Sequence, residues 1–153
     1  SDENESIIYL SPKGKKFDQT YAKKMLSKNI NIICGHFEGI DERLLETRNI
    51  EEVSVGDFIL SGGETGAFVL LDTIVRLIPE VLGNSDSLME ETFERNLLEY
   101  PQYTKPQKWE EKVVPEVLLT GDHKKIKDWR LTQSEDITRR RRSDLWKKYK
   151  KNK

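Results

Sequence analysis

Three short apolar segments constrain the fold of this chain more than any other feature of its sequence. They are 7–10, 31–34 and 53–60, the last interrupted by Gly56 and Asp57. Each has the length and aliphatic character of a buried strand. Between the first two, Phe17, Tyr21 and Met25 recur at the spacing of one helical face, and Asp18 favours a helix N-terminus. Strand, helix and strand in this order predict a parallel βαβ unit and hence an α/β fold.

A long helix is predicted over 65–78, because apolar residues occupy most of its surface. They are Ala67, Phe68, Val69, Leu70, Leu71, Ile74, Val75, Leu77 and Ile78. Such a helix is expected to be buried on nearly all sides, which suggests a dimer interface. Pro79 then ends the helix, and turn-forming residues follow it.

The second half of the chain is expected to form a small, mostly helical domain. Asp122 can cap a helix that carries Ile126 and Trp129, and the basic segment 138–151 predicts a further helix. The expected organisation is a first domain, a flexible linker or lid, and a C-terminal domain, over 1–82, 83–92 and 93–153 respectively.

The formal net charge of −1 hides a strongly basic C-terminal segment. From Thr138 to Lys153 the chain holds nine Lys or Arg residues against one acidic residue, Asp144. This segment could bind the phosphates of a nucleic acid, or it could be a solvated and poorly ordered tail; the charge pattern alone leaves both open.

Several classes of protein are disfavoured by composition. No apolar run approaches the roughly 18 residues of a membrane span, and the acidic N-terminus is unlike a signal peptide, so we expect a cytoplasmic protein. Cys34 is the only cysteine, which excludes an intrachain disulfide, and we assign it no catalytic role.

Three loops that carry glycine or proline follow the predicted strands. They contain Tyr9-Leu10-Ser11-Pro12, the segment 34–39, and the segment 54–64. Because ligands of open α/β sheets bind at strand ends, these loops predict a pocket that surrounds a flat nucleoside with backbone groups. Any one of them alone is typical of an ordinary turn. The chain contains no phosphate-binding glycine motif, which disfavours an unrelated nucleotide-binding regulator.

Four motifs, taken in this order along the chain, are similar to one known family. They are Cys-Gly-His-Phe-Glu-Gly-Ile-Asp-Glu-Arg at 34–43, Ser-Val-Gly-Asp-Phe-Ile-Leu-Ser-Gly-Gly-Glu at 54–64, Tyr-Thr-Lys-Pro at 103–106 and Leu-Leu-Thr-Gly-Asp-His at 118–123. With them the chain resembles the bacterial tRNA (guanine-N1)-methyltransferase family of the SPOUT class. The resemblance implies a trefoil-knotted parallel sheet, S-adenosylmethionine as methyl donor, and a homodimer with its active sites between the subunits. It also implies tRNA as the substrate and methylation at N1 of the guanosine immediately 3′ of the anticodon.

The same resemblance implies which residues bind the donor. They are Tyr9, Leu10, Ser11, Pro12, Gly35, Glu38, Val55, Gly56, Asp57, Phe58, Ile59, Leu60, Gly62 and Gly63. Most of these contacts are expected from backbone groups. Glu38 matches a family carboxylate near the methionine part of the donor, where a negative charge favours the ammonium and the sulfonium.

Two residues are implied to be catalytic. Glu91 stands at the position of the family's catalytic aspartate and is the expected base that removes the N1 proton of guanine, with Glu90 as an adjacent alternative. Arg76 matches an arginine suited to stabilise the charge that accumulates on O6. The expected tRNA-binding residues are Lys105, His123, Arg139, Arg140, Arg141, Arg142, Lys147 and Lys148. The family also suggests a magnesium requirement, but the sequence does not locate the ion.

The chain departs from the family pattern in several places. His36 and Phe37 replace the usual arginine and tyrosine, and Gly66 stands where relatives often have proline. The family's N-terminal segment has no counterpart in this sequence. Two hypotheses follow: an active methyltransferase, or a fragment that binds donor and tRNA without catalytic activity.

Overall fold

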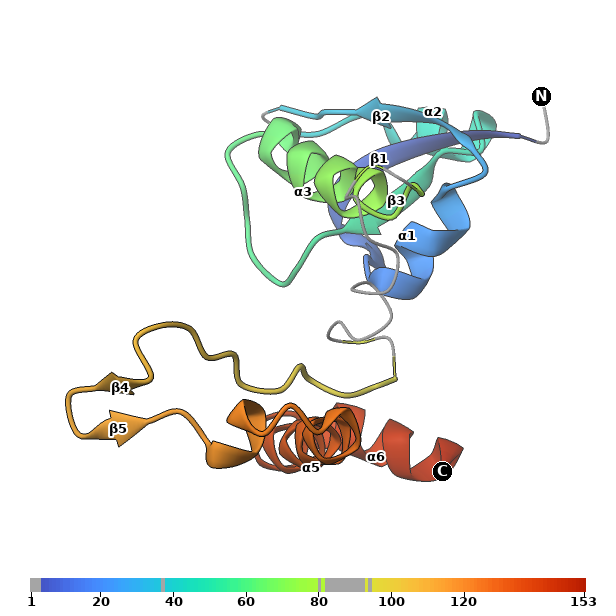
Figure 1. Cartoon of the computed structure of the whole chain (residues 1–153). Helices are drawn as coiled ribbons and strands as arrows, with labels where there is room; N and C mark the ends of the chain where they lie inside the picture. The colour runs from blue at the N-terminus through green and yellow to red at the C-terminus, as the bar shows by residue number, and fades with distance from the viewer. Residues whose placement is uncertain (1–3, 37, 80, 82–92, 94) are drawn as a thin grey trace. The chain divides into compact units, whose positions relative to one another are not determined.

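The structure, a computed structural model, describes residues 4–36, 38–79, 81, 93 and 95–153. The chain divides into two compact units, Ser1–Ser85 and Asp86–Lys153, which are described separately below (Figure 1). No helix in the described part of the chain combines the length and the apolar character needed to cross a membrane.

The N-terminal unit is built on a three-stranded parallel sheet with the strand order β2-β1-β3. Its elements are β1 (Glu5–Lys16), α1 (Gln19–Met25), β2 (Asn29–Ile33), α2 (Glu42–Thr47), β3 (Glu51–Ser54) and α3 (Gly63–Val75). The predicted α/β class and the parallel βαβ unit are confirmed. Asp18 caps α1 as predicted, since its carboxylate accepts a hydrogen bond from the backbone N–H of Tyr21.

The core of this unit lies between one face of the sheet and the two helices α1 and α3 (Figure 1). The strands contribute Ile8 and Val53 to this core. Helix α1 contributes Ala22 and Met25, and α3 contributes Leu70 and Ile74. Because successive side chains of a strand point to opposite faces, Ile8 enters the core while Tyr9 is free to line the other side.

The helix α3 is shorter and less buried than the sequence predicts. It begins at Gly63, two residues before the predicted start, and ends at Val75 instead of Ile78. Only one of its faces is buried, and Phe68 is 73% exposed, with Val69, Leu71 and Val75 also exposed. The prediction of burial on nearly all sides is therefore wrong for the single chain, because only one face of α3 contacts the sheet and α1.

The boundaries of β1 and β3 also differ from the prediction. The first strand does not end before Ser11: β1 continues to Lys16, and its pairing with β3 shifts register between Leu10 and Lys15. At this shift Gly14 lies directly against β3, where an added Cβ would come within 2.3 Å of backbone atoms of Glu52 and Val53. Only glycine allows this approach.

The third strand ends at Ser54, six residues before the predicted end at 60. The Ser54 hydroxyl donates to the carbonyl of Gly56 at 3.1 Å and accepts from its N–H at 3.3 Å, so the serine turns the chain locally instead of continuing the ladder. The apolar residues Phe58 and Ile59 consequently belong to an exposed loop. The short helix α2, capped by Asp41, was not predicted from the sequence.

The C-terminal unit is mostly helical. It contains a hairpin of β4 (Lys108–Trp109) and β5 (Lys112–Val113), a 3-10 helix η1 (Glu116–Leu119), and the helices α5 (His123–Arg141) and α6 (Ser143–Asn152). The predicted cap by Asp122 is confirmed, since its carboxylate accepts hydrogen bonds from the backbone N–H groups of Lys124 and Lys125, each at 3.1 Å.

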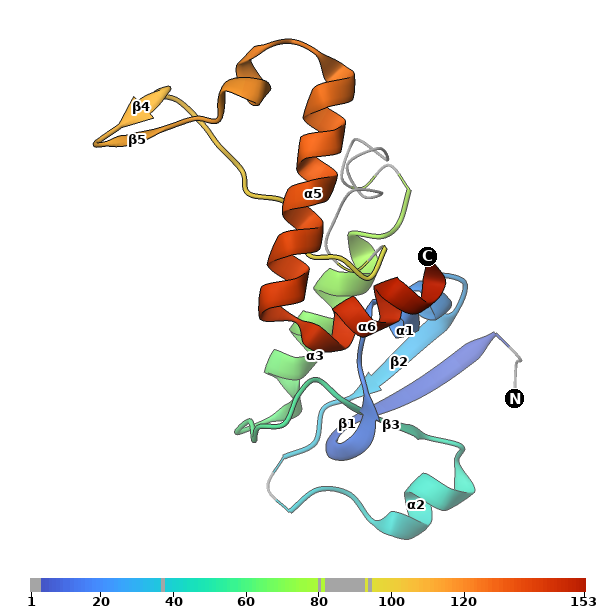
Figure 2. The ribbon, with the colours of Figure 1, turned by 90° about the horizontal axis from the view of Figure 1, so that it is seen from below.

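The basic segment does not form one separate helix as predicted. Its first residues, 138–141, complete α5, and the chain turns at Arg142 before α6 begins (Figure 2). Glu135 on α5 links the two helices, because it accepts hydrogen bonds from the Tyr149 hydroxyl at 2.6 Å and from the Lys153 ammonium at 2.9 Å. These two donors lower the pKa of the Glu135 carboxyl. The reading of this segment as a poorly ordered tail is therefore wrong.

Thr138 joins the extended segment after Phe93 to α5. It is fully buried; its hydroxyl donates to the carbonyl of Ser134 at 2.6 Å and accepts from the N–H of Leu98 at 2.8 Å. Replacing Thr138 by Val leaves that N–H without its partner, so the free energy of unfolding is expected to fall by about 2 kcal/mol.

Chemical denaturation at a fixed protein concentration measures this change, with Thr132→Val as the matched control. Thr132 donates to the carbonyl four residues before it, at 2.9 Å, as Thr138 does, but it is exposed. The control is expected to change stability by less than about 0.5 kcal/mol. Equal losses of unfolding free energy in the two variants would show that the hydrogen bond from the N–H of Leu98 does not contribute to stability.

Candidate functional site

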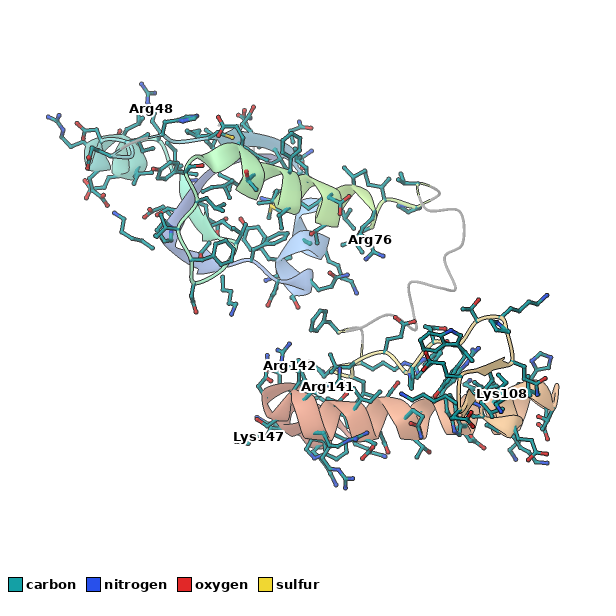
Figure 3. The ribbon with its side chains drawn as sticks, turned by 90° about the vertical axis from the view of Figure 1, so that its left-hand side faces the viewer. Arg48, Arg76, Lys108, Arg141, Arg142 and Lys147 are labelled. Atoms are coloured by element: carbon teal, nitrogen blue, oxygen red, sulfur yellow. The ribbon has the colours of Figure 1, made fainter. Side chains whose placement is uncertain are left out.

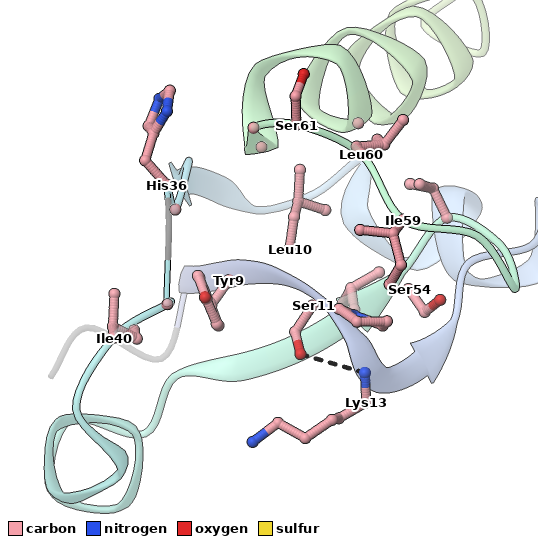
Figure 4. Close-up of a pocket in the computed structure, with 18 of the residues that line it drawn as sticks. Tyr9, Leu10, Ser11, Lys13, His36, Ile40, Ser54, Ile59, Leu60 and Ser61 are labelled. Atoms are coloured by element: carbon pink, nitrogen blue, oxygen red, sulfur yellow. Dashed lines mark hydrogen bonds between the residues drawn. The ribbon is translucent and has the colours of Figure 1, made fainter.

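A pocket of about 360 Å³ opens in the N-terminal unit where β2 and β3 end and β1 bends (Figure 4). Three segments far apart in the sequence line it: 9–13, 35–40 without residue 37, and 53–63 without Asp57. The three loops that follow the predicted strands therefore meet at one place in the structure.

Backbone contacts tie two of these loops together. The N–H of Gly63 donates to the carbonyl of Gly35 at 3.1 Å, and His36 forms an isolated antiparallel bridge with Gly62. An added Cβ at Gly63 would lie 2.7 Å from the Cα of Cys34, so the approach requires glycine. The start of α3 is thus held against the loop that follows β2.

A side-chain contact spans the same two loops. Nε2 of His36 lies 2.5 Å from Oε1 of Glu64, in the first turn of α3. The pKa of the Glu64 carboxyl is lowered by a hydrogen bond from its own backbone N–H and by the bond from His36. Both side chains are about half exposed, so we expect this contact to orient the loops more than to stabilise the fold.

Tyr9 forms one side of the pocket, next to two glycines. An added Cβ at Gly35 would lie 2.7 Å from the Tyr9 ring, and one at Gly39 would lie 3.1 Å from its hydroxyl oxygen. The phenol ring is therefore packed against bare backbone. This arrangement leaves backbone N–H and C=O groups of the loop close to the pocket, where they can contact a bound molecule directly.

The pocket combines apolar walls with a few polar groups. Leu10, Ile59 and Leu60 supply aliphatic surface, and the buried Ser11 hydroxyl accepts a hydrogen bond from the N–H of Lys13 at 3.2 Å (Figure 4). Glu38 adds an exposed carboxylate. Aliphatic walls suit a flat ring, backbone groups suit its polar edges, and a carboxylate suits a cationic substituent.

Of the predicted donor-binding residues, all but one line this pocket. The exception is Asp57, whose side chain is exposed on the same loop. Other lining residues were not predicted as site residues: Lys13, His36, Gly39, Ile40, Leu45, Val53, Ser54, Ser61 and Gly66. Most of them belong to the predicted loops, so adjacency in sequence was a usable signal. Leu45 lies on α2, and no pattern in the sequence pointed to it.

Arg76, one of the two predicted catalytic residues, does not line the pocket. Arg76 is half-buried at the C-terminal end of α3, opposite the end that begins beside the pocket at Gly63 (Figure 3). A helix of this length separates the two ends by about 20 Å. Glu91, its neighbour Glu90 and the segment 83–92 that was predicted as a lid lie outside the described residues, as does Phe37.

The predicted tRNA-binding residues all lie in the C-terminal unit. Arg141, Arg142 and Lys147 gather around the junction of α5 and α6 (Figure 3), with Arg139, Arg140 and Lys148 nearby in the sequence, while His123 begins α5. Lys105 lines a second pocket of this unit.

Two carboxylates lie among these arginines. Asp136 pairs with Arg139 and Arg140, and Asp144 pairs with Arg142. The arginines hold the pKa of both carboxyls below the usual range, so both aspartates stay ionised at neutral pH. The junction nevertheless keeps a positive excess, since cations outnumber these two anions.

Metal binding has no support from the described side chains. Within residues 4–36, 38–79, 81, 93 and 95–153, no group of three or more His, Cys, Asp or Glu side chains could hold a metal ion. We therefore assign no magnesium site to these residues.

Comparison with known proteins gives a family match over nearly the whole chain. The family model described as tRNA (Guanine-1)-methyltransferase TrmD matches residues 1–148. A protein of Pelagibacter ubique (strain HTCC1062) named tRNA (guanine-N(1)-)-methyltransferase is 72% identical over 151 residues, which are 98% of this chain and 66% of that protein. Proteins with the same name from Bartonella tribocorum and Rhodospirillum rubrum are 53% and 49% identical, over 95% and 94% of this chain and 63% and 60% of their own lengths. The chain thus spans somewhat less than two thirds of the length of these relatives.

Proposed function

Because the chain belongs to the tRNA (guanine-N1)-methyltransferase family, we propose that it transfers a methyl group from S-adenosylmethionine to N1 of the guanosine immediately 3′ of a tRNA anticodon. The observation that carries this proposal is the convergence of three loops on one pocket of about 360 Å³. A tRNA substrate also implies that the protein acts in the cytoplasm.

The pocket residues fit the methyl donor, which supplies an electrophilic methyl group on a sulfonium when it is bound. The adenosine part would lie between the aliphatic side chains of Leu10, Ile59 and Leu60, with its polar edge toward backbone groups of the loop 55–60. The carboxylate of Glu38 would face the ammonium and the sulfonium of the methionine part. Tyr9 and the adjacent glycines would limit the room and favour a bent donor.

We infer the SPOUT class, and with it a trefoil knot, from the same loops. The Gly35–Gly63 hydrogen bond and the bridge between His36 and Gly62 hold segments before and after β3 in close contact. A knotted chain requires close contact between such loops, and the family match supports this inference, because general folding rules alone would not predict a knot.

A homodimer is the proposed assembly. The exposed apolar residues of α3, Phe68 above all, offer a surface that a second copy would bury. Arg76 lies a helix length away from the pocket of its own chain. An active site shared between subunits would allow Arg76 of one subunit to act at the pocket of the other.

The proposed reaction needs a proton acceptor, because the neutral guanine has no free lone pair at N1 for attack on the methyl group. Glu91 is the proposed acceptor. Negative charge that leaves N1 accumulates on O6, where the guanidinium of Arg76 would stabilise it. Positioning of the guanine in line with the methyl group would supply much of the remaining rate.

Two measurements on the purified chain test the proposal. Calorimetric titration with S-adenosylmethionine is expected to show binding, and addition of a tRNA transcript with guanosine 3′ of the anticodon is expected to yield N1-methylguanosine at that position. A transcript with adenosine there is the control and should remain unmodified. Donor binding without methyl transfer, or no donor binding, would contradict the proposed function.

The same titration tests the role of Glu38. The Glu38→Gln variant is expected to bind the donor about tenfold more weakly, which corresponds to roughly 1.4 kcal/mol of lost attraction for the cationic methionine part. Glu46→Gln is the matched control, since Glu46 is exposed on α2 and does not line the pocket. If the two variants bind alike, Glu38 does not face the donor.

A further inference from the structure

The C-terminal unit contains a second, wide pocket of about 640 Å³ between the segment 100–107 and α5. Its lining residues are Tyr100, Pro101, Gln102, Tyr103, Thr104, Lys105, Gln107, Val114, Leu118, Leu119, Ile126, Trp129 and Arg130. Three of them are aromatic and two are cationic, while none of the described lining residues is a carboxylate. This composition differs from that of the first pocket and suits a flat aromatic ring that carries an anionic group.

The aromatic rings of this pocket leave surface open for stacking. Tyr103 and Trp129 lie with their centroids 6.2 Å apart and their planes tilted by 54°, so the two rings do not cover each other. Tyr103 is 47% exposed. Beside them the Arg130 guanidinium lies 4.6 Å from the centre of the Tyr100 ring. Aromatic rings and guanidinium planes are the surfaces on which unpaired nucleobases stack.

The polar side chains of the pocket can contact the edges of such a base. Thr104 and Gln107 offer a hydroxyl and an amide, and Lys105 offers a cation for a phosphate. The amide of Gln102 is oriented by donating to the carboxylate of Glu99 at 2.5 Å.

The arginines at the end of α5 lie in line with this pocket. Arg140 and Arg141 follow Trp129 and Arg130 by eleven residues, which is close to three helical turns, so they project from the same sides of α5 about 16 Å further along. A few nucleotides of a single strand cover that distance. One strand could therefore place a base in the pocket and its following phosphates on the arginines.

From these observations we propose that the pocket between the segment 100–107 and α5, whose lining residues differ from those of the proposed donor pocket, binds an unpaired nucleobase of RNA. The proposal rests on the proposed function, in which the substrate is a tRNA. It assigns the stacking to Tyr103 and Trp129, and the phosphate contacts to Lys105, Arg140 and Arg141. Since stacking accepts any base, the site would add affinity with little preference for sequence.

The test uses the full chain and two fluorescein-labelled oligoribonucleotides of six residues. One is complete, and the other has the same sugar–phosphate backbone but lacks all six bases. Fluorescence anisotropy over a range of salt concentrations measures both affinities. The complete oligomer is expected to bind about tenfold more tightly than the abasic one.

Variants separate stacking from charge. Tyr103→Ala should remove most of that difference without changing the salt dependence, while Tyr103→Phe should retain it. Arg141→Gln should weaken binding of both oligomers alike and lower the salt slope by about 0.7. Trp109→Ala is the matched aromatic control, because Trp109 is 64% exposed on β4 but does not line the pocket, and it should leave the difference intact.

Three results would overturn the proposal. They are equal binding of the complete and abasic oligomers, an undiminished difference in Tyr103→Ala, or the same loss in Trp109→Ala. A change in self-association of Tyr103→Ala, with unchanged binding of RNA, would instead assign the pocket to contacts between copies of the chain. Methyl transfer to tRNA is a separate measurement: a protein that methylates tRNA but binds both oligomers alike would contradict only this site.

Discussion

Replacing Glu91 by Gln is expected to lower the rate of methyl transfer by about a hundredfold to ten-thousandfold. The amide of glutamine cannot accept the N1 proton of guanine, although it keeps nearly the shape of the glutamate side chain. Binding of the donor should not change, because the pocket for the donor is formed by other loops. Single-turnover methyl transfer and calorimetric titration on the same preparation measure the two effects.

Two further variants test the assignment of this base. Glu91→Asp places the family's own residue at this position and is expected to retain activity. Glu90→Gln tests the neighbouring carboxylate. If Glu90→Gln loses turnover while Glu91→Gln keeps it, the base is Glu90, and full turnover in both variants would exclude either residue as the proton acceptor.

Replacing Gly63 by Ala is expected to lower the free energy of unfolding by about 3 kcal/mol and to weaken donor binding about a hundredfold. The added methyl group would lie 2.7 Å from the Cα of Cys34 and 3.0 Å from the N of Gly35, which are backbone atoms that no side-chain rotation can move. The clash would separate the start of α3 from the loop after β2 and break the hydrogen bond from Gly63 to Gly35. Denaturant unfolding and donor titration measure the two losses.

Gly66→Ala is the stability control for this variant. Gly66 lies in the same helix one turn later, and an added Cβ there would meet only side-chain atoms, the nearest being Cδ1 of Leu10 at 3.1 Å. Leu10 can adjust, and alanine favours a helix by about 1 kcal/mol over glycine, so stability should stay the same or rise. If Gly63→Ala has the same free energy of unfolding and the same donor affinity as the unmutated protein, the contact between the two loops is not needed for stability or for donor binding.

Local sequence patterns predicted which helices and strands form better than they predicted the residues at which these elements end. The order of β1, α1, β2, β3 and α3 and the caps at Asp18 and Asp122 follow from interactions within a few residues, and both caps are present in the structure, whereas α2 was missed. The end of β3 was mispredicted, since the run Phe58-Ile59-Leu60 is as apolar as a strand. The hydroxyl of Ser54 and the loss of a pairing partner end the strand earlier.

Much of the first pocket could be predicted because its residues cluster in three short loops. Tyr9, Gly35 and Leu60 were each expected from the motif that contains them, and all three line the pocket. Leu45 could not be predicted, because its approach depends on how α2 packs. The distance between Arg76 and the pocket could not be predicted either, because it is set by the direction and length of α3.

The sequence by itself determined the α/β class, the helix caps and the three loops, because each depends on backbone preferences and hydrogen bonds that act over a few neighbouring residues. Only the tertiary structure decided that these loops share one pocket and that Phe68 is exposed on the single chain. It also decided that Tyr103 and Trp129 enclose a second pocket with Arg130. Those features depend on contacts between segments that are distant along the chain, and a local pattern carries no information about which distant surface it will meet.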